Sequence, residues 1–503
     1  MTTAAAAITA APQPAGAQAP PPVAAVAARK STVLKNKAPV SQEVLSVQFP
    51  KPKEYILKSS SDVKAGGAKI LVVEDHRLPL VTITISVRAG SLFESANKPG
   101  VANFTAELIT EGTTSRSYEQ ITQETERIGA SLGASAGGER ATLSVSGSSE
   151  NTDQLIALLV DTLLNPTFPE DRLKQVKFQS VAQLAQQRSN PAFLAGELSR
   201  RMFYGADTPF GRLTPTPAQL QAITQEDLKS YYAARYHNAP DTLIGVAGDV
   251  KPKDIYDKLQ KALANWTTAS GTNALPTADF TPKEKTTIYL VDRPGSAQTA
   301  LSFGNIGIRR TDPNYFPLLL ANRILGADSN GRLFQKLRED KGYTYGAYSS
   351  LSSPKYPGIW GASANVRNAV TGPAVGEFLN EFARLQSEPV SDVELSVAKK
   401  AIVGGFALSL ESPSNILSRL LDVVDYGLPA DYWDQYPQKV QAVTAADIER
   451  VAKQYIGTGR IQLIAVGERK EIEEGLAKYG PVTVLTPEEV LNPAPAGGAA
   501  KTP

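Results

Sequence analysis

The chain contains few of the side chains that hydrolytic metal sites need. It has two histidines, His76 and His237, and no cysteine. A catalytic zinc site in a peptidase often takes two histidines four residues apart on one helix, with a glutamate that polarises the bound water. His76 and His237 lie far apart in the sequence and form no such pair. We therefore expect no cofactor in this chain itself. The lack of cysteine also excludes disulfides and thiolate chemistry.

The charge balance gives no sign of a strongly charged partner. The 503 residues include 52 basic and 50 acidic side chains, a net charge of +2, and no block of like charge stands out. We therefore expect neither nucleic acid nor an anionic membrane surface as a partner. The longest apolar stretch, residues 155–164, is interrupted by Asp161 and is too short to span a bilayer, so no transmembrane segment is predicted.

The N-terminus supports two interpretations. Residues 4–11 form a weak apolar run, and Ala17-Gln18-Ala19 resembles a small-residue cleavage site, but no basic residue precedes it. The segment is either a disordered leader or the end of a signal peptide that starts upstream. Export to the periplasm or secretion is slightly favoured, which the absence of cysteine suits, and a cytoplasmic location is the alternative.

Three stretches are too polar or too poor in large apolar residues to form a core. Residues 1–43, rich in alanine and proline, are predicted to be a disordered leader. Residues 268–284 are predicted to be a linker, and residues 487–503 a disordered tail. The structured part then divides into two pieces of similar length, residues 44–267 and residues 285–486.

The two pieces share a local pattern that indicates a duplicated domain. Thr224 and Thr444 each begin a helix with a Thr-x-x-Asp capping box, and each helix is followed by an apolar strand, residues 243–246 and 463–466. Caps and strands are both separated by 220 residues. Two landmarks at one spacing predict a repeated unit.

Between these landmarks, strand and helix patterns alternate. Residues 81–87 alternate strictly between apolar and polar side chains, which predicts a half-buried strand. Ser391 and Glu394 form a capping box at the start of a long helix over residues 391–410. We therefore predict an α+β fold in which each half is a mainly antiparallel sheet covered by helices.

Several short motifs then resemble a known family, the insulinase/pitrilysin-type zinc peptidases, which include the mitochondrial processing peptidase. The motifs follow the family's order and cover nearly all of residues 70–480. They are Val87-Arg88-Ala89-Gly90-Ser91-Leu92-Phe93-Glu94, Pro99-Gly100-Val101-Ala102, Glu111-Gly112-Thr113, Ile128-Gly129-Ala130-Ser131-Leu132, Tyr204-Gly205, Pro209-Phe210-Gly211 and Gly248-Asp249-Val250. The resemblance implies two homologous domains that form a clamshell chamber.

The resemblance also shows where the family's zinc site is altered. Active members carry a His-x-x-Glu-His helix where this chain has Asn103, Phe104, Thr105, Ala106 and Glu107. A third ligand, a glutamate, would fall within residues 172–188, which contain no Asp or Glu. Asn103 and Glu107 could hold a hard cation through oxygen atoms, or could simply belong to an ordinary helix face.

In the second half, residues 331–345 resemble the segment that supplies the family's arginine/tyrosine pair. By that pattern Arg338 and Tyr345 are the catalytic pair, with Tyr343 as the competing tyrosine. The resemblance implies that these side chains support the developing negative charge on the scissile carbonyl, for which a guanidinium and a phenol are suitable donors. The alternative is that Arg338 merely ends a helix and Tyr345 packs within a strand.

Three functions are compatible with these residues. The leading hypothesis is a subunit without zinc in a heteromeric metalloendopeptidase. It would bind unfolded peptide segments and supply Arg338 and Tyr345 to a homologous chain that carries zinc, as in the two-chain members that the resemblance implies. The second is a peptide-binding or structural scaffold with no role in proteolysis. The third is an active peptidase with unusual ligands around Glu107 and Glu111.

Overall fold

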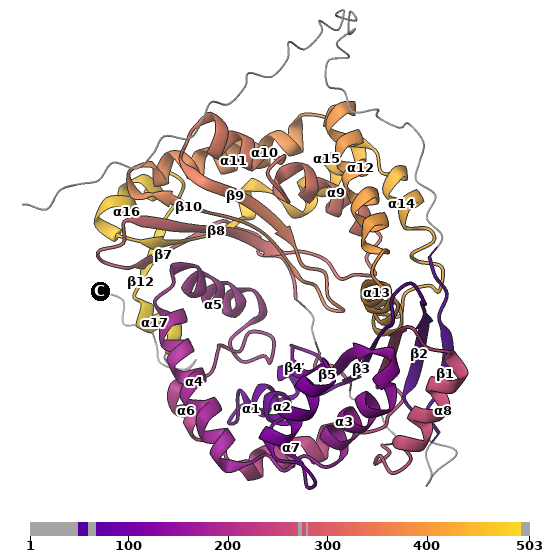
Figure 1. The fold of residues 1–503 in the computed structure, drawn as a ribbon. Helices are drawn as coiled ribbons and strands as arrows, with labels where there is room; N and C mark the ends of the chain where they lie inside the picture. Colours follow the sequence, from indigo (N-terminus) through magenta and orange to yellow (C-terminus); the bar gives the residue numbers. More distant parts are fainter. Residues whose placement is uncertain (1–48, 59–66, 270–273, 278–279, 494–503) are drawn as a thin grey trace, which may run out of the picture. The chain divides into compact units, whose positions relative to one another are not determined.

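The described part of the protein is built around two six-stranded sheets, one in each half of the chain (Figure 1). The computed structural model describes residues 49–58, 67–269, 274–277 and 280–493. The predicted leader lies outside these residues, as do parts of the predicted linker and the end of the predicted tail. The strands of the first sheet are, in spatial order, β1 (Lys53–Ile56), β2 (Lys69–Glu74), β6 (Leu243–Gly248), β3 (Leu80–Val87), β5 (Ala141–Ser148) and β4 (Ser131–Ala136). Those of the second sheet are β12 (Val482–Leu485), β7 (Thr287–Asp292), β11 (Gln462–Gly467), β8 (Gln298–Ile306), β10 (Ile359–Arg367) and β9 (Thr344–Leu351).

The two sheets repeat one topology. The strand β6 runs parallel to β2 and antiparallel to β3, and β11 runs parallel to β7 and antiparallel to β8. The strands β5 and β4 then extend the first sheet in antiparallel order, as β10 and β9 extend the second. The prediction of an α+β fold with two homologous, mainly antiparallel halves is therefore confirmed. Only the opposite edges differ, because β1 is antiparallel to β2 whereas β12 is parallel to β7.

Helices cover the sheets in the same sequence order in both halves. The helices of the first half are α1 (Val101–Leu108), α2 (Tyr118–Arg127), α3 (Thr152–Leu164), α4 (Glu170–Arg188), α5 (Pro191–Tyr204), α6 (Pro217–Gln221), α7 (Gln225–Arg235) and α8 (Pro252–Ala262). Those of the second half are α9 (Tyr315–Gly326), α10 (Arg332–Phe334), the π-helical turn η3 (Gln335–Asp340), α11 (Thr371–Ser387), α12 (Asp392–Ser409), α13 (Pro413–Tyr426), α14 (Tyr436–Ala442), α15 (Ala445–Tyr455), α16 (Arg469–Ala477) and α17 (Pro487–Leu491).

The capping boxes that predicted the repeat are present. Thr224 accepts from the backbone N–H of Asp227 at the start of α7, and Thr444 accepts from that of Asp447 at the start of α15. In both boxes the aspartate side chain also accepts from the threonine N–H, so two N–H groups of each helix start are satisfied. The box at Ser391 is formed in the same way, with Glu394. Side-chain chemistry thus fixes where these helices begin.

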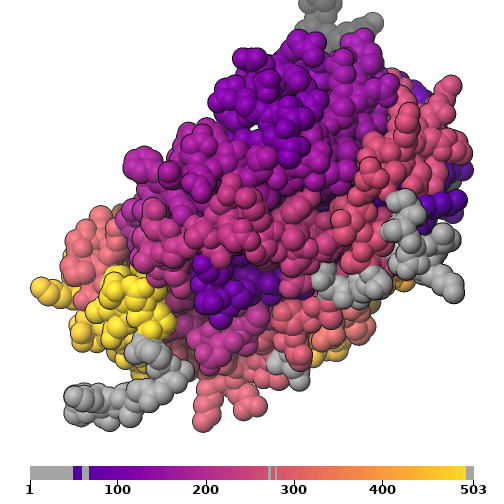
Figure 2. Space-filling view, turned by 90° about the horizontal axis from the view of Figure 1, so that it is seen from below, coloured from indigo at the N-terminus to yellow at the C-terminus, as the bar shows by residue number. Residues whose placement is uncertain are grey.

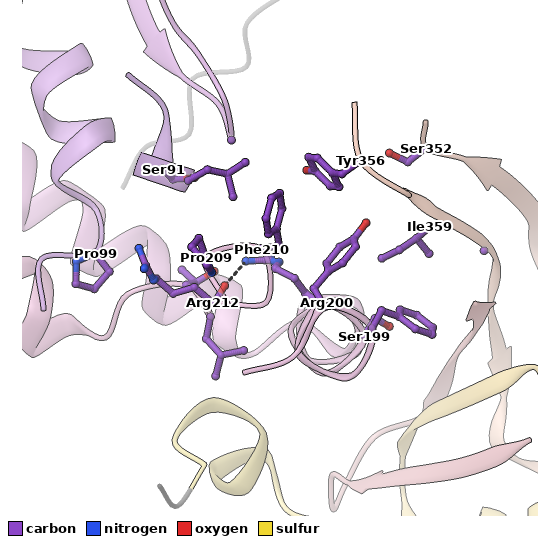
Figure 3. A pocket seen from close by; sticks show the side chains of 18 of the residues that line it. Ser91, Pro99, Ser199, Arg200, Pro209, Phe210, Arg212, Ser352, Tyr356 and Ile359 are labelled. Atoms are coloured by element: carbon purple, nitrogen blue, oxygen red, sulfur yellow. Dashed lines mark hydrogen bonds between the residues drawn. The ribbon is translucent and has the colours of Figure 1, made fainter. Parts of the chain in front are cut away.

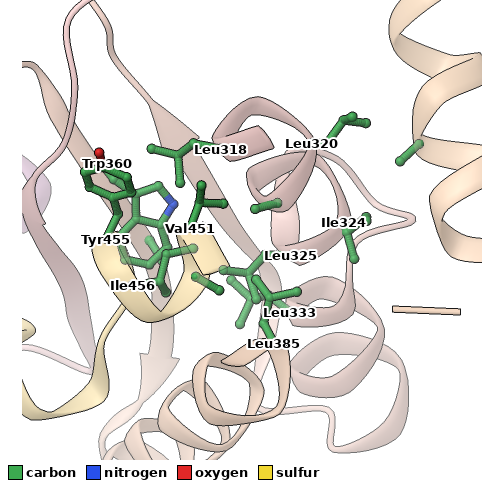
Figure 4. Packing of buried hydrophobic residues seen from close by; sticks show 14 of the residues in the cluster. Leu318, Leu320, Ile324, Leu325, Leu333, Trp360, Leu385, Val451, Tyr455 and Ile456 are labelled. Atoms are coloured by element: carbon green, nitrogen blue, oxygen red, sulfur yellow. The ribbon is translucent and has the colours of Figure 1, made fainter. Parts of the chain in front are cut away.

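Each sheet has its own hydrophobic core on the face that its helices cover. In the second half the largest fully buried side chain is Trp360 of β10, close to Leu318 of α9, Val451 of α15 and Ile456, the C-cap of α15 (Figure 4). The first half has a separate core built from β2, β3, β5 and β6 with α1, α3, α4, α7 and α8. In the first core the burial of β3 follows the alternation predicted for residues 81–87, whereas every residue of the central strands β6 and β11 is buried.

One helix from each half packs against the sheet of the other half. Leu194 and Leu198 of α5 lie in a buried cluster with Ile464 and Val466 of β11. Conversely, α13 packs against β2 and β6, and a Cβ atom added at Gly245 of β6 would lie 2.7 Å from the side chain of Leu417. Glycine at position 245 therefore permits this close approach. The exchange was not foreseen from the sequence.

Charged side chains strengthen the junction between the halves. Asp425, near the end of α13, contacts Arg140 of the first half at 2.6 Å and Lys355 at 2.7 Å. All three side chains are mostly buried. Although burial opposes ionisation, the hydrogen bond and charge of Arg140 and those of Lys355 lower the pKa of Asp425. A buried pair of this kind is costly to break, since the remaining charge would be left unpaired.

The predicted disordered tail begins with ordered structure. Residues 487–491 form α17, which Thr486 caps with a capping box to Glu489. Val490 is buried in the same cluster as Leu194 of α5, and the yellow C-terminal residues lie beside the magenta first half (Figure 2). The sequence prediction was wrong here, because one well-placed apolar side chain can anchor a short helix that has little propensity of its own. In the part of the chain that the structure describes, no helix is both long and apolar enough to cross a bilayer.

Candidate functional site

The helix aligned with the zinc motif, α1, starts at a left-handed glycine and is capped by a buried carboxylate. Gly100 has a φ of 96°, and Glu94 accepts from the backbone N–H groups of Gly100 at 3.0 Å and Ala102 at 2.8 Å. Burial raises the pKa of Glu94, and these two N–H groups partly offset the effect. Because both oxygens of Glu94 are used at the helix start, its role is structural.

Asn103 and Glu107 lie one turn apart on the exposed face of α1, where the family's two histidines would stand. They line a cavity of about 560 Å³ together with three polar, uncharged side chains of α4: Ser180, Gln183 and Gln187. Solvent reaches Glu107, but the cavity walls desolvate its carboxylate and, with the charge of Glu111, raise its pKa. The helices α1 and α4 thus face one cavity, as the resemblance implies, but their side chains differ from the ligands of the family's zinc site.

These residues do not fit a catalytic zinc ion. The cavity offers one carboxylate and several amides, whereas zinc in hydrolases takes mainly histidine nitrogen with carboxylate. Glu111 is already bound by Arg172, whose Nε lies 2.6 Å from the carboxylate and whose guanidinium stacks 3.8 Å from the Tyr118 ring centroid. Among the described residues, no three His, Cys, Asp or Glu side chains converge as a metal site. This cavity therefore does not provide the ligands of a catalytic zinc ion.

Neither histidine lies in this site. His76 follows β2 and is half exposed, with Nδ1 2.5 Å from Asp249 and Nε2 2.9 Å from Glu74. Its hydrogen bonds to Asp249 and then Glu74 raise the pKa of His76. His237 comes directly after α7 and its C-cap Tyr236.

The predicted arginine and tyrosine lie together on the second half. The Arg338 guanidinium is 5.1 Å from the ring centroid of Tyr345, and the Tyr345 side chain is 82% exposed. The carboxylate found near Arg338 belongs to the adjacent Glu339, at 4.0 Å, so the guanidinium is held only weakly. Tyr343, the competing tyrosine, packs instead against the hydrophobic core. The geometry therefore pairs Arg338 with Tyr345.

Three neighbouring cavities connect the α1 face with Tyr345. The α1 cavity shares four lining residues with a larger cavity of about 660 Å³: Gly100, Asn103, Thr214 and Pro215. The larger cavity in turn shares Gly196, Ser302 and Ser363 with a third cavity of about 550 Å³, which Tyr345 and Tyr348 line. Because they share walls, the three cavities form one path along the α5 side of the second sheet.

The central cavity combines aromatic, serine and arginine side chains (Figure 3). Phe210 and Tyr356 pack edge to face with ring centroids 4.5 Å apart. Arg200 donates to the carbonyl of Arg212 at 3.2 Å and pairs with the buried Glu197 at 2.8 Å. Burial raises the pKa of Tyr356, so its phenol stays protonated and able to donate. Apolar walls with a few fixed donors are typical of ligand-binding cavities.

Sequence reasoning missed most of this central cavity. Many of its residues come from α5, the loop after it, and the serines of β8, β9 and β10, which no local motif joins. Signals were present in four motifs of the resemblance, which contribute Ser91, Leu92, Glu94, Pro99, Gly100, Tyr204, Pro209 and Phe210 to the lining. The contact of α5 with the second sheet, which forms one wall, has no periodic sequence signature.

Comparison with known proteins agrees with this architecture. The model described as Insulinase (Peptidase family M16) matches residues 69–212, and that described as Peptidase M16 inactive domain matches residues 222–402. The chain belongs to the insulinase family, peptidase family M16, as a member whose motif helix lacks the histidine pair. The second match runs across the predicted linker, from the residue after α6 into α12.

Individual relatives point the same way. The chain is 25% identical over 357 residues to an "Uncharacterized zinc protease YmxG" of Bacillus subtilis, covering 70% of this chain and 85% of that one. It is 23% identical to a "Non-peptidase homolog YmxG" of Helicobacter pylori, covering 82% and 94% of the two chains. The crystal structure of a peptidase M16 inactive domain from Pseudomonas fluorescens superposes with a TM-score of 0.74 at 25% identity, covering 82% and 98%.

Proposed function

We propose that this protein is the zinc-lacking subunit of a heteromeric insulinase-type metalloendopeptidase. In this role it binds an extended peptide segment and supplies Arg338 and Tyr345 to the active site of a homologous chain that carries zinc. The observation that carries the proposal is the contrast between the two candidate sites. The α1 cavity lacks metal ligands, whereas the Arg338–Tyr345 pair is assembled and exposed to solvent.

The chemistry of the pair suits a reaction on a peptide carbonyl. As the carbonyl carbon becomes tetrahedral, its oxygen gains negative charge, which a guanidinium and a phenol O–H can stabilise by donating hydrogen bonds. Arg338 is held only weakly by its neighbour Glu339, so its donors remain available to a substrate. A zinc ion held by the partner chain would supply the Lewis-acid chemistry of the reaction. This chain contributes charge stabilisation and peptide binding.

The backbone around the pair also supports a functional role. Arg338 lies in the π-helical turn η3, and Tyr345 lies at a β-bulge between β9 and β10. Both irregularities are found frequently at functional sites, where they redirect a side chain. Two of them within one short segment are hard to explain by packing alone.

The test is reconstitution. The chain is purified alone and together with a zinc-bearing homologue that has an intact His-x-x-Glu-His helix, and cleavage of unstructured peptides is measured with and without a chelator. We expect chelator-sensitive cleavage only from the combined chains. Robust chelator-sensitive cleavage by the isolated chain, or stoichiometric tightly bound zinc in it, would refute the proposal. A complex that cleaves equally well with Arg338→Ala would favour the scaffold function.

We further propose that the assembly works in the periplasm or outside the cell. The support is the cysteine-free composition and the small-residue motif Ala17-Gln18-Ala19. Fractionation of native cells, with N-terminal sequencing of the mature chain, tests this. Recovery of the intact N-terminus in the cytoplasmic fraction would contradict it.

A further inference from the structure

The strand that carries Tyr345 is interrupted by a bulge. Ala347 pairs with Ala364 and Thr344 pairs with Val366, so Tyr345 and Gly346 together stand opposite the single residue Asn365. A bulge of this kind turns a side chain away from the direction that regular alternation would give it. Tyr345 owes its exposed position beside Arg338 to this extra residue.

The Thr344 hydroxyl sits at the centre of the bulge. It lies 2.7 Å from the carbonyl oxygen of Asn365 and 2.9 Å from that of Gly346, and it accepts from the backbone N–H of Gly346 at 3.1 Å. The single hydroxyl proton is shared between the two carbonyls or alternates between them. Because Thr344 is 93% buried, these backbone groups depend on it rather than on water.

The first half provides an internal comparison for this arrangement. Residues 129–134 read Gly-Ala-Ser-Leu-Gly-Ala and residues 342–347 read Gly-Tyr-Thr-Tyr-Gly-Ala. In the first copy the strand pairs in regular register with β5, and Ser131, at the position of Thr344, is exposed. A hydroxyl at this position therefore does not create a bulge by itself. It holds one only where it is buried between the two strands.

We propose that Thr344 is the positioning residue of the pair: its buried hydroxyl stabilises the bulge and thereby holds the Tyr345 ring beside Arg338. This inference rests on the proposed function for its catalytic consequence, but the placement of Tyr345 is a property of the isolated chain. Thr344 is among the residues that line the third cavity, but its hydroxyl is bound to backbone groups of the bulge, so in this scheme it acts through Tyr345.

The first experiment uses the isolated, full-length chain. Hydrogen-exchange mass spectrometry follows the Gly346 amide in wild type, Thr344→Val and Thr344→Ser, with Ser131→Ala as the matched control in the first half. We expect protection of Gly346 to fall at least about tenfold in Thr344→Val and to be kept in Thr344→Ser and Ser131→Ala. Equal protection in wild type and Thr344→Val would overturn the proposal. Thr344→Ala replaces the valine variant if that variant does not fold.

The second experiment is a double-mutant cycle in the reconstituted enzyme. Thr344→Val should lower kcat about tenfold with KM nearly unchanged, and Thr344→Ser should restore the rate. In a Tyr345→Phe background, Thr344→Val should have no further effect, since its action passes through the Tyr345 hydroxyl. Additive losses, or a slow Tyr345→Phe enzyme beside a fast Thr344→Val enzyme, would overturn the positioning role. If Tyr345→Phe is itself as fast as wild type, the proposed function fails, while the exchange experiment still decides the placement.

Discussion

In both halves a helix leads through a left-handed glycine into the edge strand of the sheet, yet the two segments differ in regularity. In the first half, α2 is α-helical, Gly129 has a φ of 60°, and β4 continues in register. In the second, η3 is π-helical, Gly342 has a φ of 62°, and β9 contains the bulge. Counted from the glycine, Arg338 and Tyr345 correspond to Thr125 and Leu132.

The helix that precedes each of these segments, α1 in the first half and α9 in the second, differs in the opposite sense: the first-half helix exposes polar side chains. In the first half, α1 exposes Asn103 and Glu107 towards a cavity, whereas every residue of α9 is buried or only partly exposed. Each half thus exposes polar side chains from a different element: α1 in the first half, and η3 with β9 in the second. The comparison indicates that a duplicated framework can keep its topology while local irregularities decide which copy presents functional side chains.

The largest expected effect tests this assignment directly. Arg338→Ala should lower kcat/KM of the reconstituted enzyme by about 10²- to 10³-fold, because a donor to the developing oxyanion is lost. The matched control is Arg127→Ala, which removes an exposed arginine from the last turn of α2 in the first half. Steady-state kinetics on one peptide substrate measures both. Equal losses in the two variants would show that the halves are not specialised as described.

The exchanged helices should contribute equally to stability. Leu417→Ala in α13 and Leu198→Ala in α5 each remove a buried side chain from the sheet of the other half, at a cost of about 3 kcal/mol. Urea unfolding of the isolated chain gives both values. A lower free energy of unfolding in only one of the two variants would mean that the other helix does not pack stably against the opposite sheet.

Rebuilding the metal site tests whether the first half still has the family's geometry. Asn103→His, Glu107→His and Gln183→Glu together place three zinc ligands around the α1 cavity. We expect this triple variant to bind one zinc ion about 100-fold more tightly than the variant with the two histidines alone, by analogy with the loss of a single supporting group. Titration calorimetry compares the two. Equal affinities would indicate that α4 no longer faces α1 at the required distance.

Substitutions of Tyr345 and Tyr343 should have clearly different effects on the rate. Tyr345→Phe removes an exposed phenol O–H and should lower kcat by about 10- to 100-fold, the value of one hydrogen bond to a charged group. Tyr343→Phe should have little effect on the rate, since its ring packs against the core. The reverse result would assign the chemistry to Tyr343 and show that the observed pairing with Arg338 is not the functional one.

The smallest expected effect is the contribution of His76, in the first half, to the pH dependence of stability. Hydrogen bonds to Asp249 and Glu74 raise the pKa of His76 above its ordinary value of 6.5, so protonated His76 is favoured in the folded state. Its contribution is therefore present at pH below 6.5 and is lost as pH rises through the raised pKa. The melting temperature measured between about pH 5.5 and 8 should fall with pH in wild type and change less in His76→Gln. Identical pH profiles would contradict this.

Much of the fold could be predicted because its signals are local. The threonine and serine caps fixed the starts of α7, α15 and α12, and the alternation of residues 81–87 gave β3. Arg338 and Tyr345 were found by a motif within one short segment. The bulge at Tyr345 could not be predicted, since it depends on how β9 pairs with β10, and no local motif marked the π-helical turn that contains Arg338.

By itself, the sequence determined that this chain has no histidine pair to hold zinc, that its domain is duplicated and where its helices begin. These features depend on residue identity and on neighbours a few positions away. Only the tertiary structure decided that α5 packs against the second sheet and α13 against the first. It also decided that Val490 anchors the C-terminal helix, and that Asn103 and Tyr345 line neighbouring cavities. Such contacts join residues hundreds of positions apart, and their stability comes from non-directional burial of apolar surface, which leaves no periodic signature in the sequence.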